Sequence, residues 1–284
     1  MYYFMIEAQK PQKVAYNVAD APIQHGQLQL SGFFNNMVNL HYHKELEYVA
    51  VLKGSMKFHV NAKTYNLTEG TGLIVNADQL HFILPDGGAD CCFQSLLIPP
   101  IYMDEHRKFV DPLMFDAIFL TDRVPWQGQV MADIRKMYDL CEDCPACYPL
   151  RLKNVFYDLW ICVCENLSEP PRLNRRLFSR TDAFKQMLAY IHENYQKPLQ
   201  LDEIARAGHV SKSVCCRIFK EYLRQTPFTY LMHYRVQVSL RYLAETKMNI
   251  TEIAAETGFS GSSYYAETFK RFYQCSPMAY RKQL

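Results

Sequence analysis

The last hundred residues of the chain contain an internal repeat. The first copy has Ile204-Ala205 followed by His209-Val210-Ser211, and the second, at an offset of 49 residues, has Ile253-Ala254 followed by Gly258-Phe259-Ser260. After one inserted residue, Phe219-Lys220, Tyr222, Thr226-Pro227 and Tyr230 match Phe269-Lys270, Phe272, Ser276-Pro277 and Tyr280. Such a repeat predicts two copies of one small helical unit, which restricts the fold of this region more than any other feature does.

Each copy has the residue types that a helix-turn-helix requires. A small residue, Ala205 or Ala254, lets the second helix cross the first closely. Gly258 suits the left-handed conformation of a tight turn, and His209 is tolerated there. We expect an apolar residue to fill each turn and a serine, Ser211 or Ser260, to cap the second helix. Apolar spacing over residues 227–246 predicts a helix that joins the two units, and Thr181 or Asp182 is expected to cap the first helix of the region.

The net charge of +2 conceals a marked asymmetry between the two parts of the chain. Residues 1–175 contain 15 Lys and Arg against 20 Asp and Glu, whereas residues 176–284 contain 16 against 9. A basic C-terminal region on an acidic N-terminal region indicates a polyanionic partner for the C-terminal region alone.

Residues 181–284 resemble the DNA-binding domain of the AraC/XylS family of transcription regulators, most clearly in ITEIAAETGFSGSSYYAETFKRFYQCSPMAYR. The resemblance implies that the second helix of each unit enters a major groove, with the two entry points about 34 Å apart. It assigns base contacts to Ser213, Cys216 and Arg217 in the first unit and to Ser262, Ser263, Ala266 and Glu267 in the second. Lys220, Lys270 and Arg271 would contact phosphates. Glu267 departs from the family, which often has Arg at this position, so the second unit is expected to recognise DNA differently.

Short strands and turns are expected from about Phe33 to Ile98, with YVAVLKG, SMKFHV and HFILP as strands, which favours a barrel or sandwich. Within this region, His41, His43, Glu47 and Gly54 have the spacing H-x-H-x3-E-x6-G, and His81 follows Gly70 by eleven residues. Both patterns resemble the motifs of cupin barrels, the usual sensor domain of this family. The resemblance implies that the three histidines and Glu47 lie together at one end of the barrel, where metal cupins bind a divalent metal.

Two roles for these four residues follow from the resemblance. They form either a divalent metal site or the polar wall of a pocket for a small-molecule effector. Asn76 and Asp78 replace the usual Pro and Gly of the second motif, so the sequence favours the effector pocket, with no cofactor certain. The alternative function is a metal-dependent cupin enzyme fused to a DNA-binding module. No other constellation of catalytic residues supports an enzyme.

The sequence therefore predicts an α+β protein with four segments. A cupin-like sensor barrel spans residues 1–100, a helical dimerisation segment 101–170, a linker 171–180 and the all-α DNA-binding domain 181–284. The apolar helical faces around 130–138 and 152–163 are expected to pair two subunits. Cys141, Cys144 and Cys147 have metal-like spacing but are interpreted as ordinary thiols. Without a secretory signal or an apolar membrane span, the protein is expected in the cytoplasm, bound to double-stranded promoter DNA as a homodimer, with RNA polymerase as a further partner.

Overall fold

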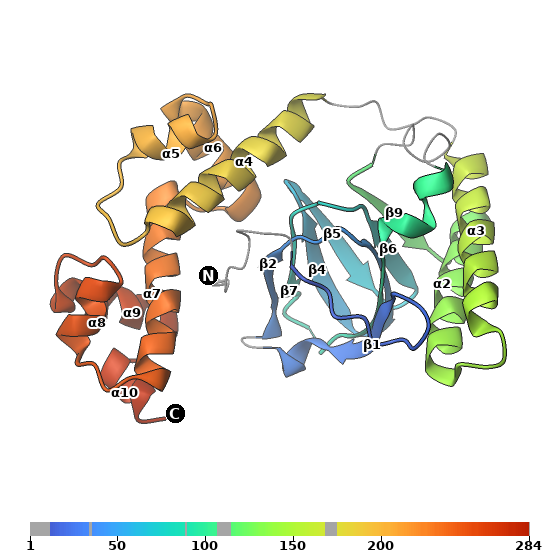
Figure 1. The fold of residues 1–284 in the computed structure, drawn as a ribbon, viewed down its shortest axis with the longest axis horizontal. Helices are drawn as coiled ribbons and strands as arrows, with labels where there is room; N and C mark the ends of the chain where they lie inside the picture. Colours follow the sequence, from blue (N-terminus) through green and yellow to red (C-terminus); the bar gives the residue numbers. More distant parts are fainter. Residues whose placement is uncertain (1–11, 34–35, 89, 107–114, 168–174, 284) are drawn as a thin grey trace. The chain divides into compact units, whose positions relative to one another are not determined.

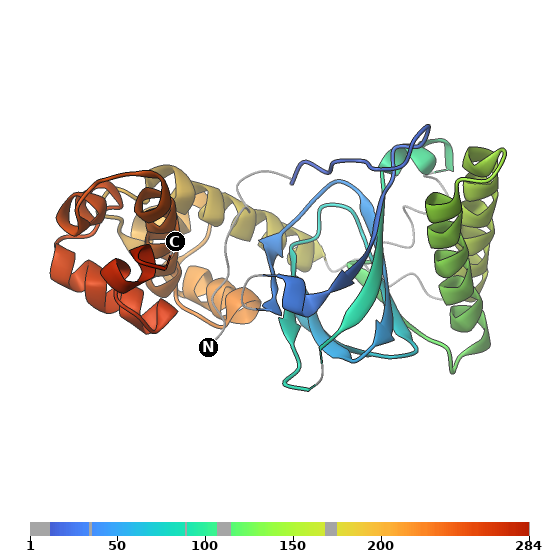
Figure 2. The ribbon, with the colours of Figure 1, turned by 90° about the horizontal axis from the view of Figure 1, so that it is seen from below.

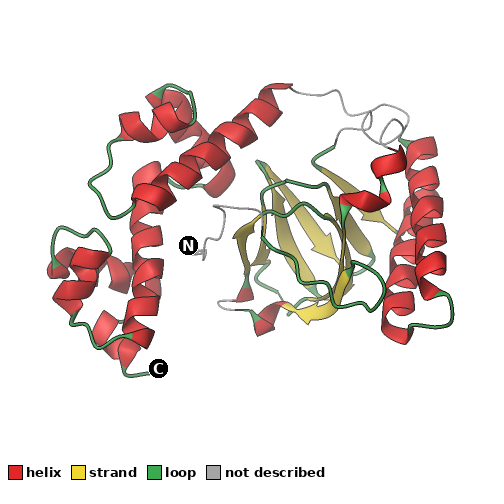
Figure 3. Cartoon of the chain, viewed as in Figure 1, coloured by secondary structure: helices red, strands yellow, loops and turns green. Residues whose placement is uncertain are grey.

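The computed structural model describes residues 12–33, 36–88, 90–106, 115–167 and 175–283. The chain divides into two compact units, with the boundary in the sequence near residue 175, and each unit is described by itself. The first unit contains strands and two long helices, and the second contains helices alone (Figure 3).

Two antiparallel sheets face each other in the first unit and form its barrel (Figures 1 and 2). One sheet has the strand order β1-β8-β3-β6-β9 and the other has the order β2-β7-β4-β5. The strands predicted from YVAVLKG, SMKFHV and HFILP are confirmed as β3, β4 and β7. The strands are β1 Gln24–Gln29, β2 Val38–His41, β3 Leu46–Lys53, β4 Ser55–Val60, β5 Lys63–Thr68, β6 Thr71–Val75, β7 His81–Pro85, β8 Cys92–Ile98 and β9 Ala117–Thr121.

Strand alternation separates two cores on either side of the five-stranded sheet. On β3, Val49 and Val51 belong to the core between the sheets, whereas Tyr48 and Ala50 belong to a core on the opposite face. Successive side chains of a strand point to opposite faces, so Glu47 lies on the same face as Val49, toward the barrel interior. The alternation of β3 therefore directs the carboxyl group of Glu47 into the barrel interior.

Helices α2 (Pro125–Asp143) and α3 (Tyr148–Asn166) pack as an antiparallel pair against the outer face of the five-stranded sheet (Figure 2). The helical segments predicted around 130–138 and 152–163 are confirmed as these two helices. The expectation that their apolar faces pair two subunits is wrong. Those faces are buried against the barrel's own sheet, including Val130, Ile134, Leu152, Leu159 and Val163. The segment from residue 101 onward also contributes β9 to the sheet, so these helices share a core with the barrel.

The second unit consists of helices arranged along the central helix α7 (Figure 1). Helix α4 begins at Arg175, inside the expected linker of 171–180, whose first four residues lie outside the described residues. The predicted connecting helix is confirmed as α7. The helices are α4 Arg175–Asn194, α5 Leu201–Ala207, α6 Lys212–Leu223, α7 Pro227–Glu245, α8 Ile250–Glu256, α9 Ser262–Tyr273 and α10 Pro277–Arg281.

The turns of the two helix-turn-helix units follow the repeat only in part. His209 and Gly258 both have a positive φ, of 52° and 79°, as the sequence predicts. A Cβ on Gly258 would lie 2.7 Å from the carbonyl oxygen of Gln196, so this position also requires glycine for space. Ser211 caps α6 through its side chain, but the expected cap by Ser260 is wrong because α9 begins after Gly261, which has no side chain to cap it.

The expectation that Thr181 or Asp182 caps the first helix of this unit is also wrong. Helix α4 already begins at Arg175, and Thr181 is buried inside it. The hydroxyl of Thr181 instead forms a hydrogen bond of 2.8 Å with that of Tyr222 on α6. Thr181, predicted to cap the start of a helix, therefore links two helices within the core.

Candidate functional site

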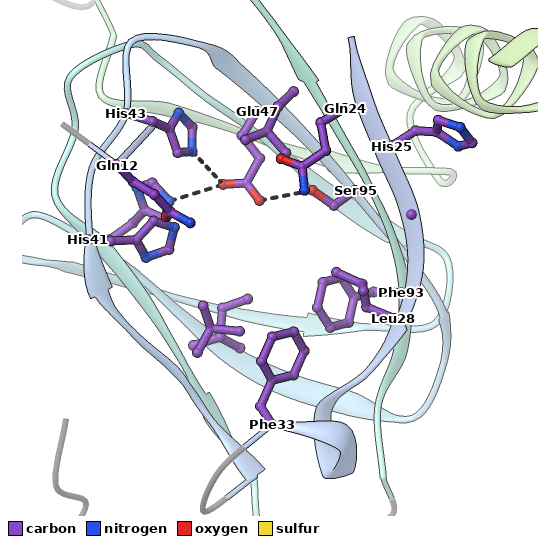
Figure 4. Close-up of a pocket in the computed structure, with 15 residues that line it drawn as sticks. Gln12, Gln24, His25, Leu28, Phe33, His41, His43, Glu47, Phe93 and Ser95 are labelled. Carbon is purple, nitrogen blue, oxygen red and sulfur yellow. Dashed lines mark hydrogen bonds and ion pairs between the residues drawn. The ribbon is translucent and has the colours of Figure 1, made fainter. Parts of the chain in front are cut away.

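A cavity of about 160 Å³ lies between the two sheets and is lined by His41, His43, Glu47 and His81. Figure 4 shows these polar groups gathered on one side, with Leu28, Phe33 and Phe93 on the other. Strands β2, β3 and β7 bring three of the four residues together, and His43 lies in the loop between β2 and β3. The four side chains thus lie together, as the cupin-like spacing predicts.

The nitrogen and oxygen atoms of this cluster converge closely. Ligand atoms of the three histidines all lie within 4.8 Å of one another. Glu47 Oε2 is 3.2 Å from Nε2 of His81 and 3.7 Å from Nε2 of His43. Each of these three atoms is buried without a hydrogen bond of normal geometry among the described residues. The other oxygen of Glu47, Oε1, accepts a hydrogen bond of 3.1 Å from the Ser95 hydroxyl.

The second nitrogen of each imidazole fixes its tautomer. Nδ1 of His41 lies 2.7 Å from the carbonyl oxygen of Asn39, Nδ1 of His43 lies 3.1 Å from that of Glu45, and Nδ1 of His81 lies 2.8 Å from that of Gln79. A carbonyl oxygen only accepts, so each Nδ1 carries the proton in these hydrogen bonds. With the proton on Nδ1, the Nε2 atoms of His43 and His81 face the carboxylate of Glu47 as acceptors.

The ionisation of the cluster agrees with this arrangement. Burial, reinforced by the neighbouring His81, lowers the pKa of His41 to about 3, which keeps that imidazole neutral. A neutral imidazole and an ionised carboxylate are the forms that ligate metals.

The donor set fits a divalent metal. Three nitrogens and one oxygen at about 2.1 Å from a tetrahedral ion would lie about 3.4 Å apart. Glu47 Oε2 has similar separations from Nε2 of His81 and of His43, and the ligand atom of His41 lies within 4.8 Å of those of the other two histidines. Donation of the other ring nitrogen to a carbonyl is the usual support for a metal-ligating histidine. Oε2 of Glu47 and the two Nε2 atoms that face it as acceptors also repel one another, and a cation would relieve that repulsion. Imidazole and carboxylate together suit Fe, Mn, Ni, Cu or Zn.

Sequence reasoning missed several polar residues of the cavity, among them Gln12, Ser95 on β8 and Gln24 on β1. Strand alternation could have grouped Phe93, Ser95 and Leu97 on one face, but only the pairing of β8 with β3 places Ser95 beside Glu47. His25 borders the cavity but points away from it in Figure 4. Its ring contacts Tyr138 and Glu142 of α2.

The second helices of the two helix-turn-helix units expose the residues assigned to DNA. On α6, Ser213, Arg217 and Lys220 are exposed and Cys216 is half-buried, while Cys215, Ile218 and Phe219 face the core. On α9 the exposed residues are Ser263, Glu267, Lys270 and Arg271, and Ser262 and Ala266 are half-buried. One face of each helix is therefore available to a groove of DNA.

Two further exposed residues extend these faces, and the resemblance did not assign them. Lys212 begins α6 and pairs with Asp202 of α5 at 3.3 Å. Tyr264 lies on α9 between the assigned Ser263 and the buried Tyr265, and its ring is 46% exposed. Their positions at the start of each second helix, beside the serines, could have identified them.

The three cysteines with metal-like spacing surround the turn between α2 and α3. Cys141 is buried, whereas Cys144 and Cys147 are exposed. Among the described residues, the one cluster able to hold a metal ion is that of His41, His43 and His81. The three cysteines therefore form no metal site in this structure.

Two family models match the chain in the two units described above. The model of an AraC-like ligand binding domain matches residues 32–116, and that of a helix-turn-helix domain matches residues 204–283. The chain is 28% identical to the uncharacterized HTH-type transcriptional regulator YdeC of Bacillus subtilis, over 99% of both chains. It is 23% identical to the melibiose operon regulatory protein of Escherichia coli, over 87% of this chain and 84% of that protein.

Among solved structures, the DNA-binding domain of the transcription factor AdpA in complex with a target DNA is similar to part of the chain. It is 24% identical, covers 36% of this chain and 92% of that domain, and has a TM-score of 0.34. Within the described residues, every helix is too short or too polar to cross a bilayer.

A ligand-binding barrel joined to two helix-turn-helix units defines a DNA-binding transcription regulator. The chain belongs to the AraC family of these regulators, with the ligand-binding domain at its N-terminal end and the DNA-binding domain at its C-terminal end.

Proposed function

We propose that α6 and α9 enter successive major grooves of promoter DNA, where some of their residues contact bases and others contact phosphates. Arg217 is the strongest candidate for base recognition because its exposed guanidinium can donate two hydrogen bonds to guanine. Ser213 and Cys216 act beside it, and Ser262, Ser263, Ala266 and Glu267 form the corresponding surface on α9. Lys220, Lys270 and Arg271 contact phosphates. The exposure of these residues on one face of each helix supports the proposal.

We propose further that the barrel cavity binds a small-molecule effector with the help of a divalent metal. The sequence alone favoured a cavity without metal. Two observations change that preference: the Nδ1 atoms of all three imidazoles face carbonyl oxygens, and the Nε2 atoms of His43 and His81 face Glu47. His41, His43, His81 and Glu47 would hold the ion, which would supply a positive charge for an effector group to bind. The reversible signal is then the effector, with the metal as a resident part of its site.

We propose that two copies of the chain pair through the exposed face of α3, in place of the buried faces that the sequence indicated. This face repeats at spacings of four and three residues, as in helix pairs that wind around each other. Leu150 and Ile161 are 70% and 55% exposed on it. Asn154, Tyr157 and Cys164 complete the same stripe.

Charge along α3 indicates the orientation of the pair. Arg151 and Lys153 flank the stripe near the start of the helix, and Asp158 and Glu165 flank it further on. An antiparallel pair sets Arg151 near Glu165 of the other copy, whereas a parallel pair sets like charges together. The occupant of this face is therefore a second copy of the chain, which would place two DNA-binding domains on one promoter in the cytoplasm. Contact with RNA polymerase at that promoter is part of the same proposal.

Selection of bound sequences from a random pool of DNA duplexes tests the central proposal. The full chain should enrich one sequence that contains two recognition elements about one helical turn apart for each subunit. Binding should weaken steeply as salt rises, because lysine and arginine contacts release counterions from the phosphates. Enrichment of no sequence, at low salt and with metal present, would refute the proposal.

A further inference from the structure

The size of the barrel cavity limits its occupant. Its volume is about 160 Å³. An engineered apolar cavity of about 150 Å³ in another protein holds a single benzene molecule, whereas pockets for drug-sized ligands span about 300–1,000 Å³. A molecule with one ring or a short chain therefore matches this volume, whereas a disaccharide with its two rings would extend beyond it.

The lining of the cavity divides into a polar wall and an apolar body. The polar wall contains the three histidines, Glu47, Ser95, Gln24 and Gln12, and Figure 4 shows His41, His43 and Gln12 close to Glu47. The opposite side presents two aromatic rings and several aliphatic side chains, with few polar groups to pair with hydroxyls. The apolar lining residues are Leu28, Phe33, Val38, Ile83, Phe93 and Leu97. A sugar would leave its hydroxyls unpaired against these residues, at a cost for each buried polar group. The lining therefore suits a molecule with one polar head and an apolar body.

The polar wall determines the charge of that head. The wall consists mainly of a carboxyl group and three imidazoles whose Nδ1 atoms already donate to carbonyl oxygens, so without a metal it offers an anion acceptors in place of a positive charge. With the divalent metal of the proposed function bound, the net charge of the wall becomes positive. The head then has to be an anionic oxygen group. This step rests on the proposed metal site.

We propose that the effector is a small monocarboxylic acid whose carboxylate lies at the histidine and Glu47 wall. Its apolar body, of one ring or about five or six carbons, packs between Phe33, Phe93 and Val38. Each methylene removed from water contributes about 0.8 kcal/mol, so affinity should rise with the body until the cavity is filled. The chain would therefore sense an organic acid, although its similarity to a melibiose regulator could suggest a sugar.

Calorimetry on the full chain tests the class of ligand. Zn²⁺-loaded protein should bind cyclohexanecarboxylate and hexanoate at least tenfold more tightly than acetate, and melibiose should not bind. Protein treated with a chelator should bind none of the acids. Tight binding of melibiose, or equal affinity for acetate and cyclohexanecarboxylate, would overturn the proposal. Binding of cyclohexylamine to the metal-free protein would overturn the assignment of an anionic head.

Variants of Val38 test the site itself. Val38→Phe should fill the cavity, lower the affinity for cyclohexanecarboxylate at least tenfold and leave the affinity for acetate and the metal content unchanged. Asn66→Phe adds the same ring on an exposed position of β5 and should bind like the original chain. Equal binding by both variants would overturn the location.

The metal content of each preparation separates this inference from the function on which it rests. Protein that takes up no stoichiometric Zn²⁺ refutes the proposed metal site, and the acid effector with it. Protein that takes up Zn²⁺ but does not distinguish acids by size refutes the acid effector alone. DNA binding is measured separately and depends on neither outcome.

Discussion

The indole nitrogen of Trp160 donates a hydrogen bond of 3.0 Å to the hydroxyl of Tyr48. Trp160 lies on α3 and Tyr48 on β3, and both side chains are buried. Glu47, the carboxylate of the cavity, is the neighbour of Tyr48 on the same strand and points to the opposite face. The hydrogen bond therefore joins the strand that carries the cavity's carboxylate to the helix that carries the proposed dimer face.

Loss of the Tyr48 hydroxyl should destabilise the barrel unit more than loss of a hydroxyl whose hydrogen-bond partner is exposed to water. Tyr48→Phe leaves the buried indole N–H without its partner, which should lower the free energy of unfolding by about 1–3 kcal/mol. Tyr138→Phe is a matched control, because the hydroxyl of Tyr138 donates to Glu142, whose side chain is 53% exposed. Urea unfolding followed by tryptophan fluorescence should show the larger loss in Tyr48→Phe. Equal losses would contradict a specific role for the buried pair.

Replacement of Arg217 should weaken specific binding and relax sequence preference. A bidentate contact with guanine contributes about 1–3 kcal/mol of discrimination, so Arg217→Ala should lower affinity for the selected site by about tenfold to a hundredfold. Affinity for random DNA should fall much less. Fluorescence anisotropy with both duplexes, at one fixed salt concentration, measures the difference. Equal losses on the two duplexes would show that Arg217 contacts phosphate.

Lys270 and Glu267 both lie exposed on α9, and replacing them should affect DNA binding differently from replacing Arg217. Lys270→Ala should weaken binding to all sequences alike and reduce the slope of log K against log salt by about one.

Glu267→Arg should raise general affinity, because it replaces a negative charge near phosphates with a positive one, and should change the base preferred by the second unit. Repeated selection from random DNA checks the preference. An unchanged consensus in Glu267→Arg would exclude that residue from base recognition.

The parts of the structure that the sequence could predict depend on local periodicity. The repeat placed both helix-turn-helix units correctly. Turn residues such as Gly258 and cap residues such as Ser211 determine the backbone only of their immediate neighbours, so the local sequence is enough to predict their effect. The cap predicted at Ser260 is wrong because α9 begins after Gly261, one residue later than the match between Ser211 and Ser260 indicates. Periodicity also identified the apolar faces of α2 and α3, but it does not say what covers them. The barrel's own sheet covers both faces.

The cavity shows the same limit. A spacing of two residues, as between His41 and His43, predicts that both side chains lie on one face of a strand, yet β2 ends at His41 and His43 lies in the following loop. The two rings meet because that loop turns, which the spacing alone does not show. Ser95 could not be found at all, because its contact with Glu47 depends on a pairing between strands that are 48 residues apart. Contacts of this kind follow from strand register, which distant parts of the chain determine together.

Two buried histidines should make the DNA-binding unit sensitive to acid. Burial lowers the pKa of His192 and of His233 to about 3, well below the ordinary value of 6.5. The unfolded chain therefore binds more protons than the folded chain between about pH 6.5 and 3. The stability that these neutral rings contribute is fully present above about pH 6.5 and is lost as the pH falls, by up to about 1.4 kcal/mol per pH unit for each ring.

Circular dichroism between pH 7 and 5.5, where few carboxylates titrate, measures this loss. Both tryptophans of the chain, Trp126 and Trp160, lie in the barrel unit, so their fluorescence follows that unit and the helical signal follows both. His192→Gln keeps an acceptor for the hydroxyl of Tyr230, with which His192 Nε2 shares a hydrogen bond of 2.7 Å. This variant should show a shallower dependence of stability on pH. An unchanged dependence would mean that His192 does not titrate on unfolding.

A charge on the exposed face of α3 should separate the proposed dimer. Ile161 is 55% exposed in the single chain, and pairing would bury it, so Ile161→Asp would place a carboxylate in the interface. The dimer should dissociate about a hundredfold more readily, equivalent to about 2.7 kcal/mol. Phe119→Asp alters another exposed apolar residue, on β9, and should leave the dimer intact. The orientation is tested by Arg151→Glu, which should weaken pairing, and by the added change Glu165→Arg, which should restore it. Sedimentation velocity at micromolar concentration measures each case, and a monomeric original chain or a dimeric Ile161→Asp would each refute pairing through α3.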